Sequence, residues 1–216
     1  MPAVPIKAEY GPTLGRLLSP RWRAASPLTR GLARVLVVGV VALAVGAFLT
    51  LENAHYSRGG PVPFSFSYRG IFRAPPAAGE WVRLERRGSG GVLEDSFAVR
   101  PLMLPRYSGS LSGELPLYAA GYIRSLRSHD ADFVLRGEGK TRVNTVPAYN
   151  VEYTTRIAGR TMYGRDVLLV AQKPGQRAGV NIVMLTSPTA DAQVTSPLEV
   201  ASAGVLLKPL KTLTLG

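Results

Sequence analysis

The feature that most constrains this chain is an apolar run of seventeen residues, Val35 to Leu51, without a single charged side chain. At about 1.5 Å of rise per residue, a helix of this length reaches roughly 25 Å, close to the shortest that crosses a hydrocarbon core. A buried core helix is the alternative, but a helix of that kind normally keeps one polar face, and this run has none. We therefore expect one transmembrane helix over residues 35–51.

Small residues recur within this apolar run, at Gly39, Ala42 and Gly46. Ala42 and Gly46 are four positions apart, a spacing that lets the backbones of two apolar helices approach closely. The pair predicts a weak homodimer formed through the span.

The residues before the run predict its orientation. Residues 1–34 hold six basic side chains and one acidic side chain. Positive charge beside a transmembrane helix stays in the cytoplasm, so we expect a plasma-membrane protein with a cytoplasmic N-terminus and an extracytoplasmic C-terminal domain. Frequent prolines predict that the tail itself is disordered. A cleaved signal peptide or a transit peptide is the alternative, but the long basic region and the prolines favour an uncleaved anchor.

Composition excludes several classes of site. The chain has no cysteine and only two histidines, which excludes disulfides, thiolate metal sites and a cysteine nucleophile and disfavours histidine-based sites. The net charge of +12 would suit nucleic-acid binding. That charge includes no long basic run, however, and part of it serves orientation. We expect no nucleic-acid partner, no metal and no cofactor.

The rest of the chain divides into a short linker and one domain. Residues 52–63 are rich in glycine and proline and predict a stalk. Residues 64–216 suit one domain with a single core. Helical spacing over 114–127, and a capping box that begins at Ser196 and leads to a stop at Pro209, predict two helices. Alternating apolar and polar residues predict strands at 64–68, 81–86, 93–99, 133–136, 148–154, 161–171 and 179–186, with a short edge strand at 213–215.

The order of these elements predicts the fold class. Consecutive strands joined by tight turns pair antiparallel, and two amphipathic helices must then cover the sheet. We expect an α+β domain in which an antiparallel sheet of about six strands and its covering helices form an αβα-type sandwich, preceded by the transmembrane helix.

Four stretches of this domain resemble the Mog1/PsbP-like family in its membrane-anchored bacterial versions. The resemblance covers residues 62–216 and consists of patterns of strands and turns. It implies an α/β sandwich that works as a binding or assembly module and carries no shared catalytic residues. The stretches are the aromatic strand 64–68, the segment 146–153, the hairpins around Gly159-Arg160 and Pro174-Gly175, and the closing segment 206–210.

The strongest candidate for a binding site is a group of arginines around one predicted hairpin. Arg156, Arg160 and Arg165 flank the turn at 157–160. Guanidinium groups bind phosphate and carboxylate well, so the group predicts a site for an envelope protein or an anionic wall component. The alternative is a solvated basic turn.

Other motifs carry weaker chemistry. Gly139-Lys140-Thr141 is similar to the end of a phosphate-binding loop, but the first glycine of that pattern is missing and a polar hairpin turn is favoured. Two carboxylate pairs, Glu94-Asp95 and Asp130 with Asp132, have the ligand type that hard cations prefer. Solvated carboxylates are the more common explanation. His129 is interpreted as a surface residue.

The sequence therefore favours a single-pass membrane-anchored binding or assembly module of a bacterial cell envelope, without catalytic residues. The alternative is an extracytoplasmic hydrolase that combines a carboxylate with Arg156, Arg160 and Arg165. A further alternative is an adaptor whose functional part is the cytoplasmic tail, residues 1–34.

Overall fold

The computed structural model describes residues 26–50, 53–106, 111–170 and 177–216. By their internal contacts the residues divide into two compact units, Met1–Leu49 and Thr50–Gly216. Each unit is considered by itself below.

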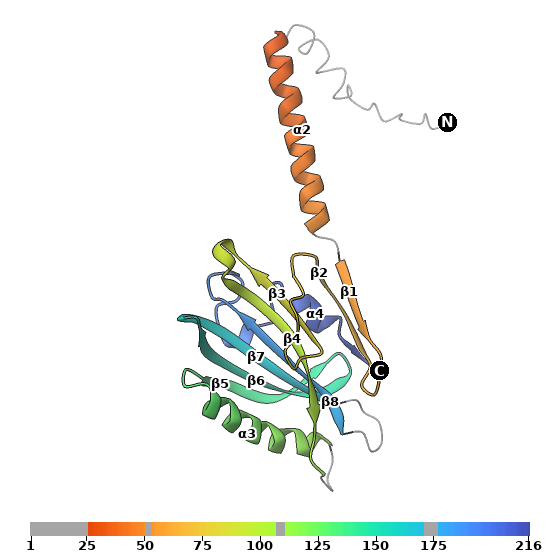
Figure 1. Ribbon diagram of the computed structural model, residues 1–216, viewed down its shortest axis with the longest axis vertical. Helices are drawn as coiled ribbons and strands as arrows, with labels where there is room; N and C mark the ends of the chain where they lie inside the picture. Colours follow the sequence, from red (N-terminus) through yellow and green to blue (C-terminus); the bar gives the residue numbers. More distant parts are fainter. Residues whose placement is uncertain (1–25, 51–52, 107–110, 171–176) are drawn as a thin grey trace, which may run out of the picture. The chain divides into compact units, whose positions relative to one another are not determined.

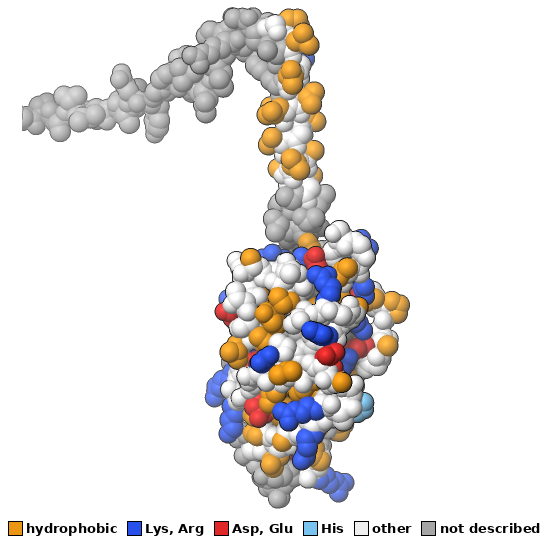
Figure 2. All heavy atoms as spheres, turned by 90° about the vertical axis from the view of Figure 1, so that its left-hand side faces the viewer, with side chains coloured by type: hydrophobic (Ala, Val, Ile, Leu, Met, Phe, Trp, Pro, Cys, Tyr) orange, Lys and Arg blue, Asp and Glu red, His pale blue; other side chains and the backbone are white. Residues whose placement is uncertain are grey.

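The first unit contains one helix, α2 (Pro27–Thr50). Its apolar side chains are exposed, among them Leu28, Val35 and Leu43 (Figure 2). Within the part of the chain that the structure describes, no helix is long and apolar enough to cross a membrane. The predicted span over 35–51 is therefore not confirmed, and its last residue, Leu51, lies outside the described residues.

The second unit is built on a six-stranded antiparallel sheet in the order β3-β4-β8-β7-β6-β5 (Figure 1). Tight turns join β3 to β4, β5 to β6 and β6 to β7, so neighbours in sequence pair locally. Strand β8 pairs with both β4 and β7 and so joins the two parts of the sheet. The strands are β3 (Val82–Arg87), β4 (Leu93–Met103), β5 (Val134–Val143), β6 (Val146–Ile157), β7 (Arg160–Val170) and β8 (Ala178–Thr186).

A smaller antiparallel sheet, in the order β1-β2-β9, consists of β1 (Asn53–Arg58), β2 (Phe64–Arg69) and β9 (Thr214–Leu215). The aromatic strand and the short C-terminal strand are therefore confirmed as strands. They lie in a sheet of their own, however, in which β2 pairs with β9 on one side and with β1 on the other. Strand β1 lies within residues 52–63, which the sequence predicts as a stalk and not as a strand.

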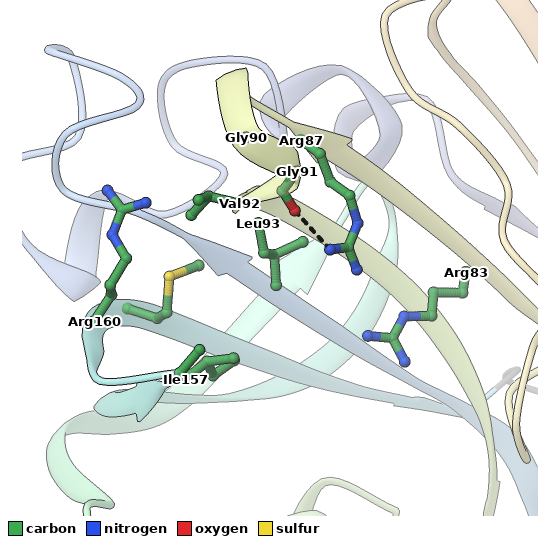
Figure 3. A pocket seen from close by; sticks show the side chains of 10 residues that line it. Arg83, Arg87, Gly90, Gly91, Val92, Leu93, Ile157 and Arg160 are labelled. Carbon is green, nitrogen blue, oxygen red and sulfur yellow. Dashed lines mark hydrogen bonds between the residues drawn. The ribbon is translucent and has the colours of Figure 1, made fainter.

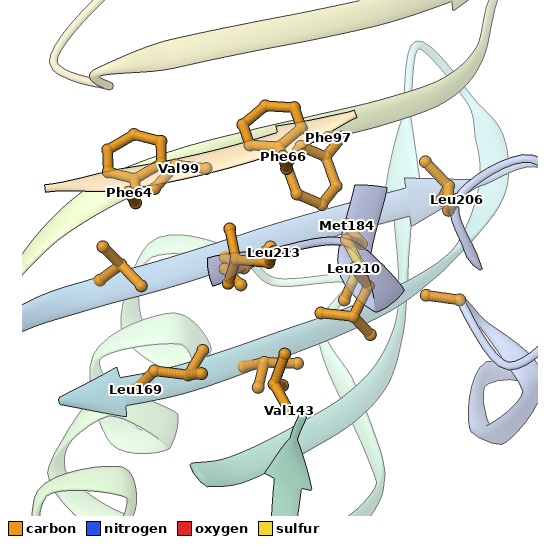
Figure 4. Close-up of a cluster of buried hydrophobic side chains, with 14 of the residues drawn as sticks. Phe64, Phe66, Phe97, Val99, Val143, Leu169, Met184, Leu206, Leu210 and Leu213 are labelled. Carbon is orange, nitrogen blue, oxygen red and sulfur yellow. The ribbon is translucent and has the colours of Figure 1, made fainter. Parts of the chain in front are cut away.

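The main core lies against one face of the large sheet (Figure 4). The alternation predicted for β2 places Phe64 and Phe66 inward, and both are buried. The rings of Phe66 and Phe97 have centroids 4.9 Å apart and are tilted by 54°. Aromatic contact across the two sheets thus replaces the helix expected as the second layer of the sandwich.

The opposite face of the large sheet is covered by α3 (Leu111–His129). The helical spacing predicted this element, and its inward side chains Leu115, Ala119 and Ile123 are buried in a second apolar cluster. Pro116 lies inside the helix rather than in its first turn, because α3 begins earlier than the spacing predicted, so the helix lacks the one backbone hydrogen bond that an N–H at this position would donate.

The predicted closing helix is wrong. The capping box at Ser196 forms, but it leads only to the three-residue turn η2 (Pro197–Glu199). The backbone then leaves helical geometry, since Ala201 and Gly204 have φ of 59° and 72°. Helix α4 (Leu207–Lys211) contains Pro209 instead of stopping before it. Burial of Val200 and Leu206 in the main core outweighs the local helical spacing.

The strand expected at 133–136 is longer than predicted and runs to Val143. Gly139-Lys140-Thr141 lies inside β5, where Lys140 pairs with Tyr149 of β6. The motif is therefore neither a phosphate-binding loop nor a hairpin turn, because pairing with β6 holds it extended. The turn predicted at 173–176 lies outside the described residues.

Candidate functional site

The candidate site lies at one end of the large sheet. Strand β8 stops at Thr186, which pairs with Asp95 of β4 and Tyr163 of β7. Both neighbours extend past this point, because β4 begins at Leu93 and β7 at Arg160. A pocket of about 390 Å³ opens here, lined by residues of β3, β4, β6, β7 and two turns. Its position follows from strand length, since the middle strand is shorter than the strands beside it.

One wall of the pocket is the connection between β3 and β4. Gly90 and Gly91 have φ of 78° and 74°, a conformation that glycine adopts without steric cost. The Arg87 Nη1 atom donates a hydrogen bond of 2.8 Å to the carbonyl oxygen of Gly91 (Figure 3). This bond fixes the turn against its own strand.

The other wall is the hairpin between β6 and β7. Ala158 and Gly159 both have positive φ, 50° and 77°, which is the signature of the type I′ turn that matches the twist of paired strands. Ile157 pairs with Arg160 across the turn. The hairpin predicted at 157–160 is confirmed, and it places both of these side chains in the lining.

Three arginines line the pocket, and their pairing is unequal. The Arg83 Nε atom lies 2.7 Å from one oxygen of Glu85, and the Arg87 Nη2 atom lies 2.7 Å from the other. One buried carboxylate therefore serves two guanidinium groups. Arg160 instead donates to the Thr189 hydroxyl at 3.2 Å, and no acidic side chain pairs with it in the described ranges. The lining holds three cations and no acid.

Apolar side chains make up most of the remaining lining. Leu93 and Ile157 are partly accessible, and Met162 is buried beneath them. Figure 3 shows Leu93 between Arg160 on one side and Arg83 and Arg87 on the other. The pocket thus offers an apolar surface with cations at two sides.

The structure separates the three arginines predicted as one site. Arg160 lines the pocket, Arg156 is exposed on the neighbouring strand, and neither pairs with a carboxylate within the described ranges. The Arg165 Nη1 atom donates to the Val200 carbonyl at 3.0 Å and to the Ser202 hydroxyl at 3.1 Å. Burial lowers the pKa of Arg165. The side chain thus ties the C-terminal segment to the sheet.

Sequence reasoning missed Arg83 and Arg87. They alternate with core residues along β3, so the strand pattern places them on one face. Nothing in that pattern brings β3 near the β6–β7 hairpin, because the connection depends on how β8 is inserted between β4 and β7.

The predicted carboxylate pairs are engaged with protein groups. Arg86 contacts Glu94 at 2.8 Å and Asp95 at 2.5 Å. Burial raises the pKa of Asp95 despite this arginine and a hydrogen bond from Thr186. Asp130 accepts hydrogen bonds from the Asp132 backbone and the Thr155 hydroxyl. Across the described ranges, no three potential metal ligands gather in one place.

A buried polar network under α3 was also missed. Asp166 is fully buried and accepts hydrogen bonds from the hydroxyls of Tyr122, at 2.5 Å, and Tyr153, at 3.0 Å. Tyr122 in turn accepts one from the Asn181 amide at 3.0 Å. Burial raises the pKa of Asp166 to about 6, although the two hydroxyls and the charge of Arg100 oppose the shift. The network joins α3, β6, β7 and β8.

The comparisons with known proteins concern the fold. No protein-family model and no curated protein matches the sequence. Among solved structures, the chain is similar to proteins with the Mog1/PsbP-like fold, which bears out the fold that the sequence resemblance implied.

Two of these structures align over most of both chains. LpqN, described as involved in cell envelope biogenesis of Mycobacterium tuberculosis, has a TM-score of 0.52 and 8% identity over 76% of this chain and 91% of its own. Cyanobacterial PsbP (CyanoP) from Synechocystis sp. PCC 6803 has a TM-score of 0.51 and 12% identity over 77% of this chain and 94% of its own. At these identities the likeness establishes the fold alone.

Proposed function

We propose that residues 50–216 form an extracytoplasmic binding or assembly module of a cell envelope, and that the pocket between the β3–β4 turn and the β6–β7 hairpin holds an anionic partner. The observation that carries the proposal is the lining itself, with three arginines around an apolar surface and no acid. A fold shared with LpqN, whose description names cell envelope biogenesis, supports the setting.

The charges at the pocket favour binding over hydrolysis. A carboxylate that acts as general base needs an oxygen free to reach a water molecule. Glu85 is the acid nearest to the lining arginines, and both of its oxygens are engaged, one by Arg83 and one by Arg87. Two guanidinium groups on one buried carboxylate hold it in a fixed position, which suits a structural role. An envelope protein or anionic wall component is the proposed partner.

A cross-linking experiment tests the proposed function. A photoreactive amino acid replaces Val92, which lines the pocket, in the full-length chain expressed in its own cells. The matched control carries it at Leu117, which is exposed on α3. We expect an adduct from position 92 and not from 117, and we expect the charge reversal Arg160→Glu to abolish it.

Two results would contradict this reading. Identical adducts from both positions would show that the pocket is not the contact surface. Turnover of an envelope substrate by the purified chain, lost in Arg160→Glu, would favour the hydrolase instead. Location is tested separately by a reporter fused after Gly216 that is active only outside the cytoplasm, and an inactive reporter on a stable fusion would refute the extracytoplasmic placement.

A further inference from the structure

The three arginines of the pocket differ in how many of their N–H donors are already engaged by protein groups. Arg87 directs Nε and Nη2 at Glu85 and Nη1 at the Gly91 carbonyl. Arg83 forms an ion pair with Glu85, with its Nε atom 2.7 Å from a carboxylate oxygen. Both side chains are therefore held by the protein and contribute mainly positive field. Cations fixed in this way attract an anion into the pocket by their charge, without forming direct hydrogen bonds to it.

Arg160 is the cation of the lining best placed to bind an anion directly. A guanidinium has five N–H donors, and the one hydrogen bond described for Arg160 runs from Nη2 to the neutral hydroxyl of Thr189. Its planar fork matches a phosphate or carboxylate in two-point contact. With one such arginine, the pocket suits a ligand with a single anionic group rather than a polyanion.

The apolar surface beside Arg160 requires a second chemical part in the ligand. Leu93 and Ile157 flank the pocket, and 37% of Ile157 remains exposed. An inorganic anion would leave this surface in water, whereas a hydrocarbon would cover it at a gain proportional to the area buried. A volume of about 390 Å³ lies in the range of small-molecule sites and far exceeds the size of a phosphate group.

We propose that the pocket binds a small anionic amphiphile, with its one phosphate or carboxylate group at Arg160 and its hydrocarbon against Leu93, Ile157 and Met162. The inference rests on the proposed binding function and names the class of ligand. The same chemistry occurs in a soluble ester and in a lipid headgroup with the first part of its acyl chain, so the test contains an arm for each.

Calorimetric titration of the full-length chain with hexyl phosphate, inorganic phosphate and 1-hexanol tests the two parts of the ligand separately. We expect hexyl phosphate to bind at least tenfold more tightly than either of the others. Arg160→Gln removes the charge and should weaken hexyl phosphate and inorganic phosphate alike, each about tenfold. Ile157→Ser removes apolar surface and should weaken hexyl phosphate while leaving inorganic phosphate unchanged.

Two controls complete the design. Arg127→Gln removes an exposed arginine on α3, outside the pocket, and should bind all three probes as the unchanged chain does. Sedimentation with phosphatidic acid vesicles, against phosphatidylcholine vesicles, distinguishes the sources. Binding to phosphatidic acid that Arg160→Gln abolishes identifies a lipid headgroup, and hexyl phosphate binding without vesicle binding identifies a soluble ester; either result supports the proposal.

The proposal is overturned if hexyl phosphate binds no more tightly than inorganic phosphate, or if Arg160→Gln and Ile157→Ser both bind hexyl phosphate as tightly as the unchanged chain does. In either case an adduct at position 92 that depends on Arg160 would leave the binding function standing and reject only the ligand class. If neither the preference for hexyl phosphate nor the Arg160-dependent adduct at position 92 is observed, both the ligand class and the binding function are rejected.

Discussion

The replacement Asp166→Asn tests the buried network under α3 through the pH dependence of stability. The folded pKa of Asp166, about 6, lies above the ordinary aspartate value of 3.8 because of burial. Between these two values the folded state keeps a proton that the unfolded state has lost. The carboxyl therefore contributes stability that is complete below about pH 4 and is lost as the pH rises through 6.

The size of the effect follows from the shift. One pKa unit corresponds to about 1.4 kcal/mol, so Asp166 should lower the free energy of unfolding by roughly 2–3 kcal/mol between pH 4 and pH 8. Asparagine does not titrate, and this loss should disappear in Asp166→Asn. The groups that face Asp166 are Tyr122, Tyr153 and Arg100, and none of them titrates in this range, since burial raises the pKa of both tyrosines and Arg100 keeps its charge.

Urea unfolding of the full-length chain at several pH values, followed by the fluorescence of Trp81 with Trp22 replaced by Phe, gives the measurement. The difference between the two proteins is the informative quantity, because other titrating groups such as Asp95 contribute equally to both. Asp132→Asn, at an exposed position, is the matched control and should run parallel to the unchanged chain. Parallel profiles for Asp166→Asn as well would refute the raised pKa.

Three further changes test the packing and the charges. Gly164→Ala should lower the free energy of unfolding by about 1–3 kcal/mol in urea, because the new Cβ would meet the Tyr153 ring at 2.3 Å. Gly139→Ala, whose Cβ would meet only the Asn150 side chain at an ordinary contact distance of 4.0 Å, should cost less than about 1 kcal/mol. Arg165→Ala should release the segment that it ties to β7, seen as faster amide exchange at Ser202, and unchanged exchange would contradict that role. Glu85→Gln should leave Arg83 and Arg87 without their carboxylate, so the free energy of unfolding measured in urea should fall by about 1–3 kcal/mol. The same variant should bind hexyl phosphate more tightly at low salt. A stability equal to that of the unchanged chain would contradict the pairing.

The parts of the fold that could be predicted depend on contacts between near neighbours in sequence. Helix α3 follows from spacing alone, and the β6–β7 hairpin follows from a short turn with glycine at its second central position. Strand β1 was missed because its pairing with β2 is set by the core that both strands cover. The closing helix was wrong because local spacing competed with burial, and burial of Leu206 won.

The candidate site was predicted only in part, because only some of its residues are near neighbours in sequence. Arg160 was found because it adjoins a recognisable turn, and the pocket contains it. Arg83 and Arg87 come from a distant strand, and their place depends on the strand order. Arg165, predicted to share the site with Arg160, has a structural role instead. A strand alternates its side chains between two faces, and Arg165 lies on the face opposite to Arg160 and Met162.

The short strand β9 has a consequence for how the chain is made. Thr214 pairs with Ser65 of β2, and the backbone N–H of Gly216 donates to the Pro63 carbonyl at 3.0 Å. Strand β9 thus completes a sheet whose other two strands leave the ribosome much earlier. Until β9 emerges, the edge of β2 has an open row of backbone donors and acceptors and the aromatic core beneath it is uncapped. A nascent chain of this kind has reason to depend on a chaperone for that interval, since its small sheet closes only when β9 pairs with β2.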